Sequence, residues 1–182
     1  MSFQNADLIF LGTGQGELDQ SIVESTAGSK KLNYSHVAIV KVDADGQVTI
    51  IEASPKGGVQ ATDWENYRQN RQEAISLYRF KEPVARPEAV IAKAEAKLGK
   101  PYNKSFYPDD PGYYCSELVL EAFAGQKDFK TIPMRFGPRG TVLPSWQTYF
   151  DKLGKSVPNG VAGSNPNNLI EQGLLEFVEQ VQ

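Results

Sequence analysis

The sequence has one cysteine and one histidine, Cys115 and His36. A single cysteine excludes an internal disulfide, and one residue of each kind argues against a zinc site built from the usual ligands. We therefore predict no metal ion and no cofactor. The scarcity also restricts any thiol chemistry, because a cysteine nucleophile with an imidazole base must then use Cys115 and His36.

The sequence also lacks a long apolar run and an excess of positive charge. No stretch approaches the roughly 18 apolar residues of a membrane span. Nineteen Lys and Arg face 22 Asp and Glu, a formal net charge of -3, with no basic stripe. Nucleic acid and anionic membranes are therefore not expected as partners.

The start and the length of the chain give two further expectations. The N-terminus has neither a basic start nor an apolar signal region, so the sequence as given predicts a cytoplasmic protein; a leader removed earlier would leave the same sequence. Its 182 residues, 40% hydrophobic and 23% charged, fit one soluble domain over residues 1–182.

Cys115 lies at the predicted start of a helix. Pro111 and Gly112 cannot lie inside a helix, whereas Leu118 and the apolar residues after it recur at helical spacing. A thiol in the first turn of a helix meets free N–H groups and the positive end of the dipole, which favour the thiolate. A lone cysteine on an apolar face is also the pattern of a small core residue, and this stretch alone fits both interpretations.

A hairpin is predicted around the only histidine. Residues 34–42 and 47–54 read as strands, and Asp43-Ala44-Asp45-Gly46 is typical of a three-residue loop that ends in a left-handed glycine. This loop places Val42 opposite Val48, Val40 opposite Ile50, Ala38 opposite Glu52 and His36 opposite Ser54. A two-residue loop would shift the register, but the Asp-Gly pair argues against it.

In this register His36 and Glu52 share one face as diagonal neighbours, about 7–8 Å apart at the backbone. Burying both costs free energy unless they pair. A paired carboxylate can hold one ring nitrogen protonated and orient the other toward a partner. The alternative is a purely structural hydrogen bond.

The remaining elements follow from local patterns. Gly12 to Gly16 suggests a dinucleotide loop, but Glu17 stands where the third glycine is required, so we predict a turn. Strands are expected at residues 7–11 and 74–80. Helices are expected around Ile22 as far as Gly28, after Asp63, over 87–99 with Leu98 on the apolar face against the sheet, over 145–153 and from Asn165.

Several segments together resemble the YiiX/YebB-like (YaeF/YiiX) proteins, a circularly permuted branch of the NlpC-type papain-like cysteine hydrolases. These segments are Asp-Leu-Ile-Phe near the N-terminus, Tyr34 to Val40, Ile51-Glu52-Ala53, Pro101-Tyr102-Asn103, Tyr114 to Val119, and Asn165-Pro166 with Leu169. In ordinary members the cysteine helix precedes the histidine strand, whereas here histidine comes first, as in the permuted branch. The likeness runs from about Asp7 to Leu169.

The resemblance implies an α+β fold, a small antiparallel sheet or open barrel with the cysteine helix packed against it. By match of motif, Cys115 would be the nucleophile, His36 the general base and Glu52 the residue that orients it. The implied reaction is hydrolysis of an amide bond through a thioacyl enzyme. The implied substrates are cell-wall peptides or N-acyl amino acids, and lipids among relatives of the fold.

Three further residues are predicted to bind substrate: Tyr102, Tyr114 and Ser116. Either tyrosine could equally be a core aromatic. At Asn103 the family usually has aspartate, so we expect a charged contact to substrate to be missing here. A binding module that kept the fold without turnover, or an acyltransferase with the same triad, are the alternative functions.

Overall fold

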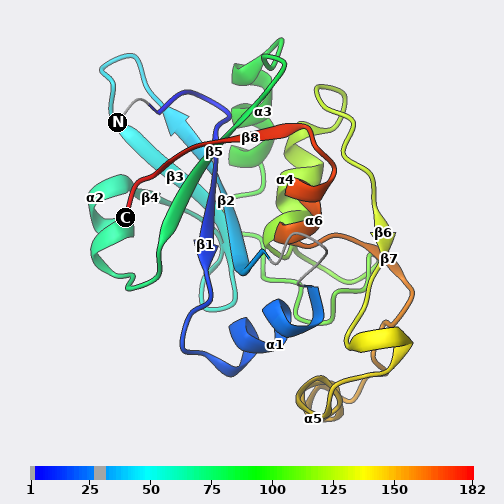
Figure 1. Cartoon of the computed structure of the whole chain (residues 1–182). Helices are drawn as coiled ribbons and strands as arrows, with labels where there is room; N and C mark the ends of the chain where they lie inside the picture. Colours follow the sequence, from blue (N-terminus) through cyan, green and yellow to red (C-terminus); the bar gives the residue numbers. More distant parts are fainter. Residues whose placement is uncertain (1–2, 27–31) are drawn as a thin grey trace.

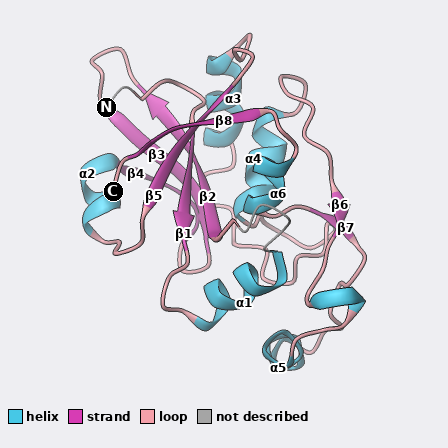
Figure 2. Cartoon of the chain, in the orientation of Figure 1, coloured by secondary structure: helices cyan, strands magenta, loops and turns pink. Residues whose placement is uncertain are grey.

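The computed structural model describes residues 3–26 and 32–182. A six-stranded antiparallel sheet runs through its centre in the order β4-β3-β2-β1-β5-β8, with helices on both sides (Figures 1 and 2). The strands are β1 Leu8–Gly12, β2 Tyr34–Val42, β3 Val48–Ser54, β4 Gly58–Asp63, β5 Ile75–Phe80 and β8 Leu175–Gln180.

Both faces of the sheet are covered, which explains why β1 reads as a continuous apolar run rather than an alternating one. On one face Leu8 and Phe10 pack with the buried residues of α3 (Pro87–Glu95), α4 (Cys115–Phe123) and α6 (Pro166–Glu171). On the other face Ile9 and Leu11 pack against α2 (Trp64–Gln69). Figure 2 shows α2 on the side of the sheet opposite α4 and α6.

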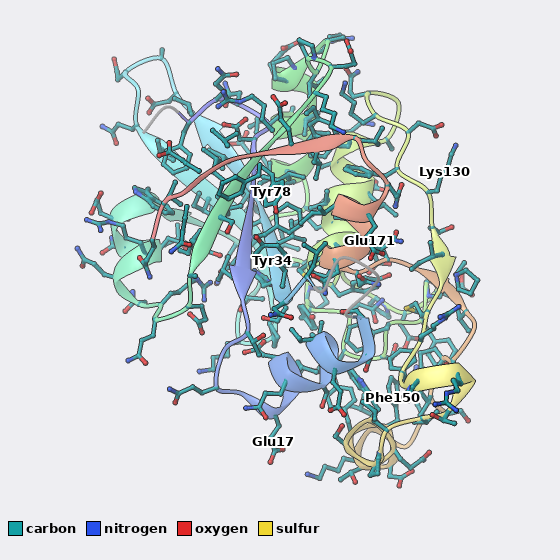
Figure 3. The ribbon with its side chains drawn as sticks, in the orientation of Figure 1. Glu17, Tyr34, Tyr78, Lys130, Phe150 and Glu171 are labelled. Carbon is teal, nitrogen blue, oxygen red and sulfur yellow. The ribbon has the colours of Figure 1, made fainter. Side chains whose placement is uncertain are left out.

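A smaller lobe lies beyond one end of the sheet. It contains α1 (Glu17–Thr26), α5 (Pro144–Leu153), a 3₁₀ turn at Pro138–Gly140 and a two-stranded ribbon of β6 (Ile132–Pro133) and β7 (Ala162–Gly163). Trp146 joins the two helices, since its indole N–H lies 2.7 Å from Ser25 Oγ and 3.2 Å from the Ser21 carbonyl oxygen. Phe150, labelled in Figure 3, is fully buried on α5.

Most of the expected elements are confirmed. β2 has the predicted bounds, α4 begins at Cys115, and α5 ends before Gly154, which is left-handed at φ 65°. Asn165 caps α6 by accepting from the Asn168 N–H. The C-terminal residues form β8. β1 and β2 are antiparallel, whereas a dinucleotide-binding βαβ unit would need two parallel strands. The segment from Gly12 to Gly16 is therefore not a dinucleotide loop.

The hairpin register is confirmed near the turn and wrong farther away. Val42 pairs with Val48 and Val40 with Ile50, but the ladder of these strands ends at Ile39–Ile51. The expected pairs Ala38–Glu52 and His36–Ser54 therefore do not form. The two strands diverge because β2 continues along β1, with His36 opposite Leu11, while β3 continues along β4, with Glu52 opposite Gln60.

Two helix predictions need correction. α3 ends at Glu95 instead of Gly99, because the Gly99 N–H bonds to the Val59 carbonyl and turns the chain back to β4. Leu98, expected on the apolar face, is 43% exposed, and α3 packs mainly on α4. α1 begins at Glu17, earlier than expected, and its predicted end at Gly28 lies outside the described residues.

Candidate active site

Cys115 is the first residue of α4 and is 5% exposed. Tyr114 caps the helix, and Glu117 Oε2 accepts a hydrogen bond from the Tyr114 N–H at 3.1 Å. This half of a capping box satisfies one backbone donor at the helix start, while the N–H groups of the first turn lack intrahelical partners. The sulfur therefore sits among free backbone donors at the positive end of the helix.

A glycine allows the segment of Tyr102 to run beside this helix start. The Asn103 N–H lies 3.2 Å from the Tyr113 carbonyl, and the Tyr113 N–H lies 3.1 Å from the Pro101 carbonyl. Gly112 has φ 94°, and a Cβ there would meet the Pro101 carbonyl oxygen at 2.0 Å. Any other residue would push the two segments apart, so Gly112 places Tyr102 next to the cysteine.

His36 bridges Cys115 and Glu52. Its Nε2 lies 2.6 Å from Glu52 Oε2, and the Cys115 thiol lies close enough to the same ring to raise its pKa. Because Nε2 is engaged by the carboxylate, Nδ1 remains for the sulfur. The imidazole reaches both groups where β2 and β3 have separated, beyond the end of their ladder. The structure thus brings together the three residues that the sequence analysis singled out.

The Glu52 carboxylate is held by three more side chains that sequence reasoning missed. Gln60 Nε2 and Arg71 Nη2 donate to Oε1, both at 2.9 Å, and Arg71 Nη2 also lies 2.9 Å from Oε2. The Tyr67 hydroxyl donates to Oε2 at 3.2 Å. The Arg71 guanidinium lies over the Tyr67 ring, 4.1 Å from its centroid. Of these three residues, only Gln60 could have been found from the sequence. A strand predicted over the residues of β4 would have placed Gln60 opposite Glu52.

These contacts set the charges of the pair. Burial alone would lower the pKa of His36, but hydrogen bonds to Cys115 and Glu52 and their charges raise it to about 10. Burial alone would raise the pKa of Glu52, but the hydrogen bond and charge of His36, with Arg71 and Gln60, lower it to about 2. The pair is therefore an imidazolium and a carboxylate at neutral pH.

A cavity of about 50 Å³ opens beside Cys115, lined mainly by apolar and aromatic side chains. All three residues predicted to bind substrate line it. Tyr114 and Ser116 are also engaged within the protein, because the Ser164 N–H donates to the Tyr114 hydroxyl and the Ser164 and Ser116 hydroxyls lie 2.8 Å apart. The Tyr102 hydroxyl makes no hydrogen bond to another described residue. Ile22, Phe106, Phe136 and Trp146 supply much of the remaining lining.

The side chain of Asn103, where the family usually has aspartate, faces the protein and does not line the cavity. Asn103 is 1% exposed, and its Nδ2 donates to the Tyr107 carbonyl at 2.9 Å and to Glu117 Oε2 at 3.3 Å. Burial raises the pKa of Glu117 to about 7 against the hydrogen bonds from Tyr114 and Asn103, which lower it. An amide suits this position because an aspartate would confront a second carboxyl group.

The part of the chain that the structure describes contains no group of three or more His, Cys, Asp and Glu residues placed to hold a metal ion. Among the same residues no helix is long and apolar enough to cross a membrane.

Comparison with known proteins supports the fold and gives the family. The chain resembles a crystal structure described as the metalloprotein YiiX from Escherichia coli O157:H7, with a TM-score of 0.78, 21% sequence identity and 97% of each chain covered. A comparison with curated proteins found no match. Residues 2–179 match the family described as permuted papain-like amidase enzymes, YaeF/YiiX, family C92. That match spans nearly the whole chain, which therefore belongs to the C92 family of permuted papain-like amidases.

Proposed function

We propose that this protein is a cysteine amidase in which Cys115 is the nucleophile, His36 the general base and Glu52 the residue that orients His36. The observation that carries the proposal is the imidazole that contacts both the Cys115 thiol and, at 2.6 Å, the Glu52 carboxylate. A nucleophile, a base and an orienting acid in hydrogen-bond contact are the arrangement that activates a thiol.

The reaction follows from this arrangement. The His36 imidazolium holds the proton that Cys115 gives up, and the Cys115 sulfur attacks the amide carbonyl carbon. The tetrahedral adduct collapses when its C–N bond breaks and the imidazolium returns the proton to the leaving amine. Water, deprotonated by His36, then attacks the thioester, so that the acid is released and the thiol restored. Glu52 holds the ring in one tautomer throughout.

Two donors are available for the oxyanion. One is the Cys115 backbone N–H at the start of α4, where no intrahelical acceptor exists. The other is the Tyr102 hydroxyl, which lines the same cavity as Cys115 and has no hydrogen-bond partner among the described residues. Donors of this kind stabilise charge that develops only in the transition state, so they contribute to the rate rather than to substrate binding.

The cavity favours one part of the expected substrate range. Its aromatic and aliphatic lining suits an apolar group placed beside the sulfur, such as an acyl chain or an apolar side chain. We therefore propose an N-acyl amino acid, a small peptide or a lipid amide whose apolar portion enters this cavity. Nothing in the lining supplies a dense set of charges for a strongly ionic group.

Alkylation tests the triad without a known substrate. Iodoacetamide should label Cys115 near neutral pH, and His36→Ala should slow labelling by about tenfold or more, because the thiol then loses its base. Slow labelling that is unaffected by His36→Ala would show that Cys115 is a packing residue and not an activated nucleophile. Release of free amine from N-acyl amino acids or short peptides, lost in Cys115→Ala, would distinguish turnover from binding alone.

A further inference from the structure

Phe106 has a backbone conformation that is rare for its side chain. Its φ is 60°, in the left-handed region that glycine adopts easily and bulky residues seldom do. The residue is nevertheless buried, with 7% of its surface exposed. A strained residue persists only where its surroundings fix it, and such residues gather at functional sites.

The loop on both sides of Phe106 is fixed by side-chain hydrogen bonds. Asn103 Nδ2 donates to the Tyr107 carbonyl at 2.9 Å, and the Ser105 hydroxyl contacts both Asn103 Oδ1, at 3.1 Å, and the Asp110 carboxylate. The Tyr107 N–H in turn lies 3.3 Å from Ser105 Oγ. The buried amide of Asn103 thus belongs to a small group of contacts that fixes the residues on both sides of Phe106.

The result of this conformation is the position of the ring. Phe106 lines the cavity beside Cys115, and its ring centroid lies 5.2 Å from that of Tyr114 and 5.7 Å from that of Trp146. The Phe106 ring centroid also lies 6.2 Å from that of Phe136, which lines the cavity too, and 6.4 Å from that of Phe150. Because Phe136 and Trp146 line the same cavity, the Phe106 ring is one wall of it and takes up space beside the sulfur.

We propose that Phe106 is a specificity-determining residue that limits the size of the apolar group accepted beside Cys115. A glycine would relax the backbone at this position, but it would remove the ring and enlarge the cavity beside Cys115. The proposal deepens the proposed function and rests on it, because the cavity is taken to receive the substrate of the Cys115 reaction.

Alkylating probes of two sizes test whether Phe106 limits the size of the group that fits beside Cys115. Iodoacetamide and N-benzyl-iodoacetamide share one reactive group, so the ratio of their labelling rates at Cys115 reports the space beside the sulfur. In the unchanged protein the benzyl probe should react at least about tenfold more slowly, and in Phe106→Gly the two rates should agree to within about threefold. Phe106→Leu should give an intermediate ratio and retains a buried side chain if the glycine variant fails to fold.

A matched control removes strain without opening the cavity. Arg139 also has a positive φ, 52°, and does not line the cavity, so Arg139→Gly should keep the ratio of the unchanged protein. A ratio that stays unchanged in folded Phe106→Gly or Phe106→Leu would overturn the proposal. Failure of the proposed function is separate, because it appears as iodoacetamide labelling that does not depend on His36.

Discussion

The Nε2 atom of His36 and the Oε2 atom of Glu52 lie 2.6 Å apart. His36 is on β2 and Glu52 on β3, and both lie beyond the last pair of the ladder between these strands. Because β2 and β3 separate after Ile39–Ile51, the imidazole is free to turn between the carboxylate and the Cys115 thiol. A regular ladder would have held the two side chains at a fixed cross-strand spacing. The contact between the two side chains thus lies beyond the end of the ladder rather than within it.

The anchoring of Glu52 should be measurable in the reactivity of Cys115. Glu52→Gln removes the charge that holds His36 protonated at Nε2, and we expect iodoacetamide labelling to slow by about tenfold. Arg71→Met should give a smaller loss of about threefold, because His36, Gln60 and Tyr67 still hold the carboxylate. Glu95→Gln, at a half-buried ion pair with Lys41 that does not include Glu52, is the control. Equal rates in all three variants would exclude an orienting role for Glu52.

The charges of His36 and Glu52 should appear in the pH dependence of stability. The pKa of His36 is raised from 6.5 to about 10, so its contribution is full below 6.5 and is lost as the pH rises through 10. The pKa of Glu52 is lowered from 4.5 to about 2, so its contribution is full above 4.5 and is lost as the pH falls through 2.

Urea unfolding of the unchanged protein and of His36→Gln at a series of pH values checks the expected losses of stability at high and at low pH. The difference in free energy of unfolding should be widest between pH 4.5 and 6.5 and should narrow toward pH 10 and toward pH 2. Curves that run parallel from pH 3 to pH 10 would contradict the assignment of these charges to the folded state.

Tyr102→Phe separates oxyanion stabilisation from thiol activation. Alkylation by iodoacetamide develops no oxyanion, so its rate should stay within about twofold, whereas kcat for an amide substrate should fall by about a hundredfold. Tyr149→Phe removes a hydroxyl that donates to the Lys104 carbonyl and should leave both rates near their original values. A fall in the alkylation rate as large as the fall in kcat would place Tyr102 in the support of the thiol instead.

Asn103→Asp tests the buried contact with Glu117. Above the Glu117 pKa of about 7, two carboxylates would meet where an amide now donates at 3.3 Å. We expect a loss of about 1–3 kcal/mol in the free energy of unfolding at pH 8, and a smaller loss at pH 5, where the two groups can share a proton. Asn159→Asp, at an exposed amide that donates to the Gly140 carbonyl, should show no such pH dependence. The same loss at both pH values would contradict this account.

Local sequence patterns were sufficient for most of the elements that carry Cys115, His36 and Glu52. Pro111 and Gly112 set the start of α4 at Cys115, because neither fits a helix interior. The Asp-Gly turn fixed the register of β2 and β3 near the loop, because turn geometry and side-chain alternation act over a few residues. The bounds of β2 and the left-handed Gly154 after α5 follow from equally local preferences.

The surroundings of the triad depend on contacts between distant segments. Gln60 lies on β4, whose short and half-polar sequence gives little strand signal, and Arg71 reaches Glu52 from the loop after α2. The amide of Asn103 and the ring of Phe106 take their positions from a loop closed by its own hydrogen bonds. The sequence by itself determined which side chains could react and where the helix of Cys115 begins. Tertiary packing decided which groups hold Glu52 and how much space remains beside the sulfur, because free energy gained by burying distant side chains together overrides the preference of any single segment.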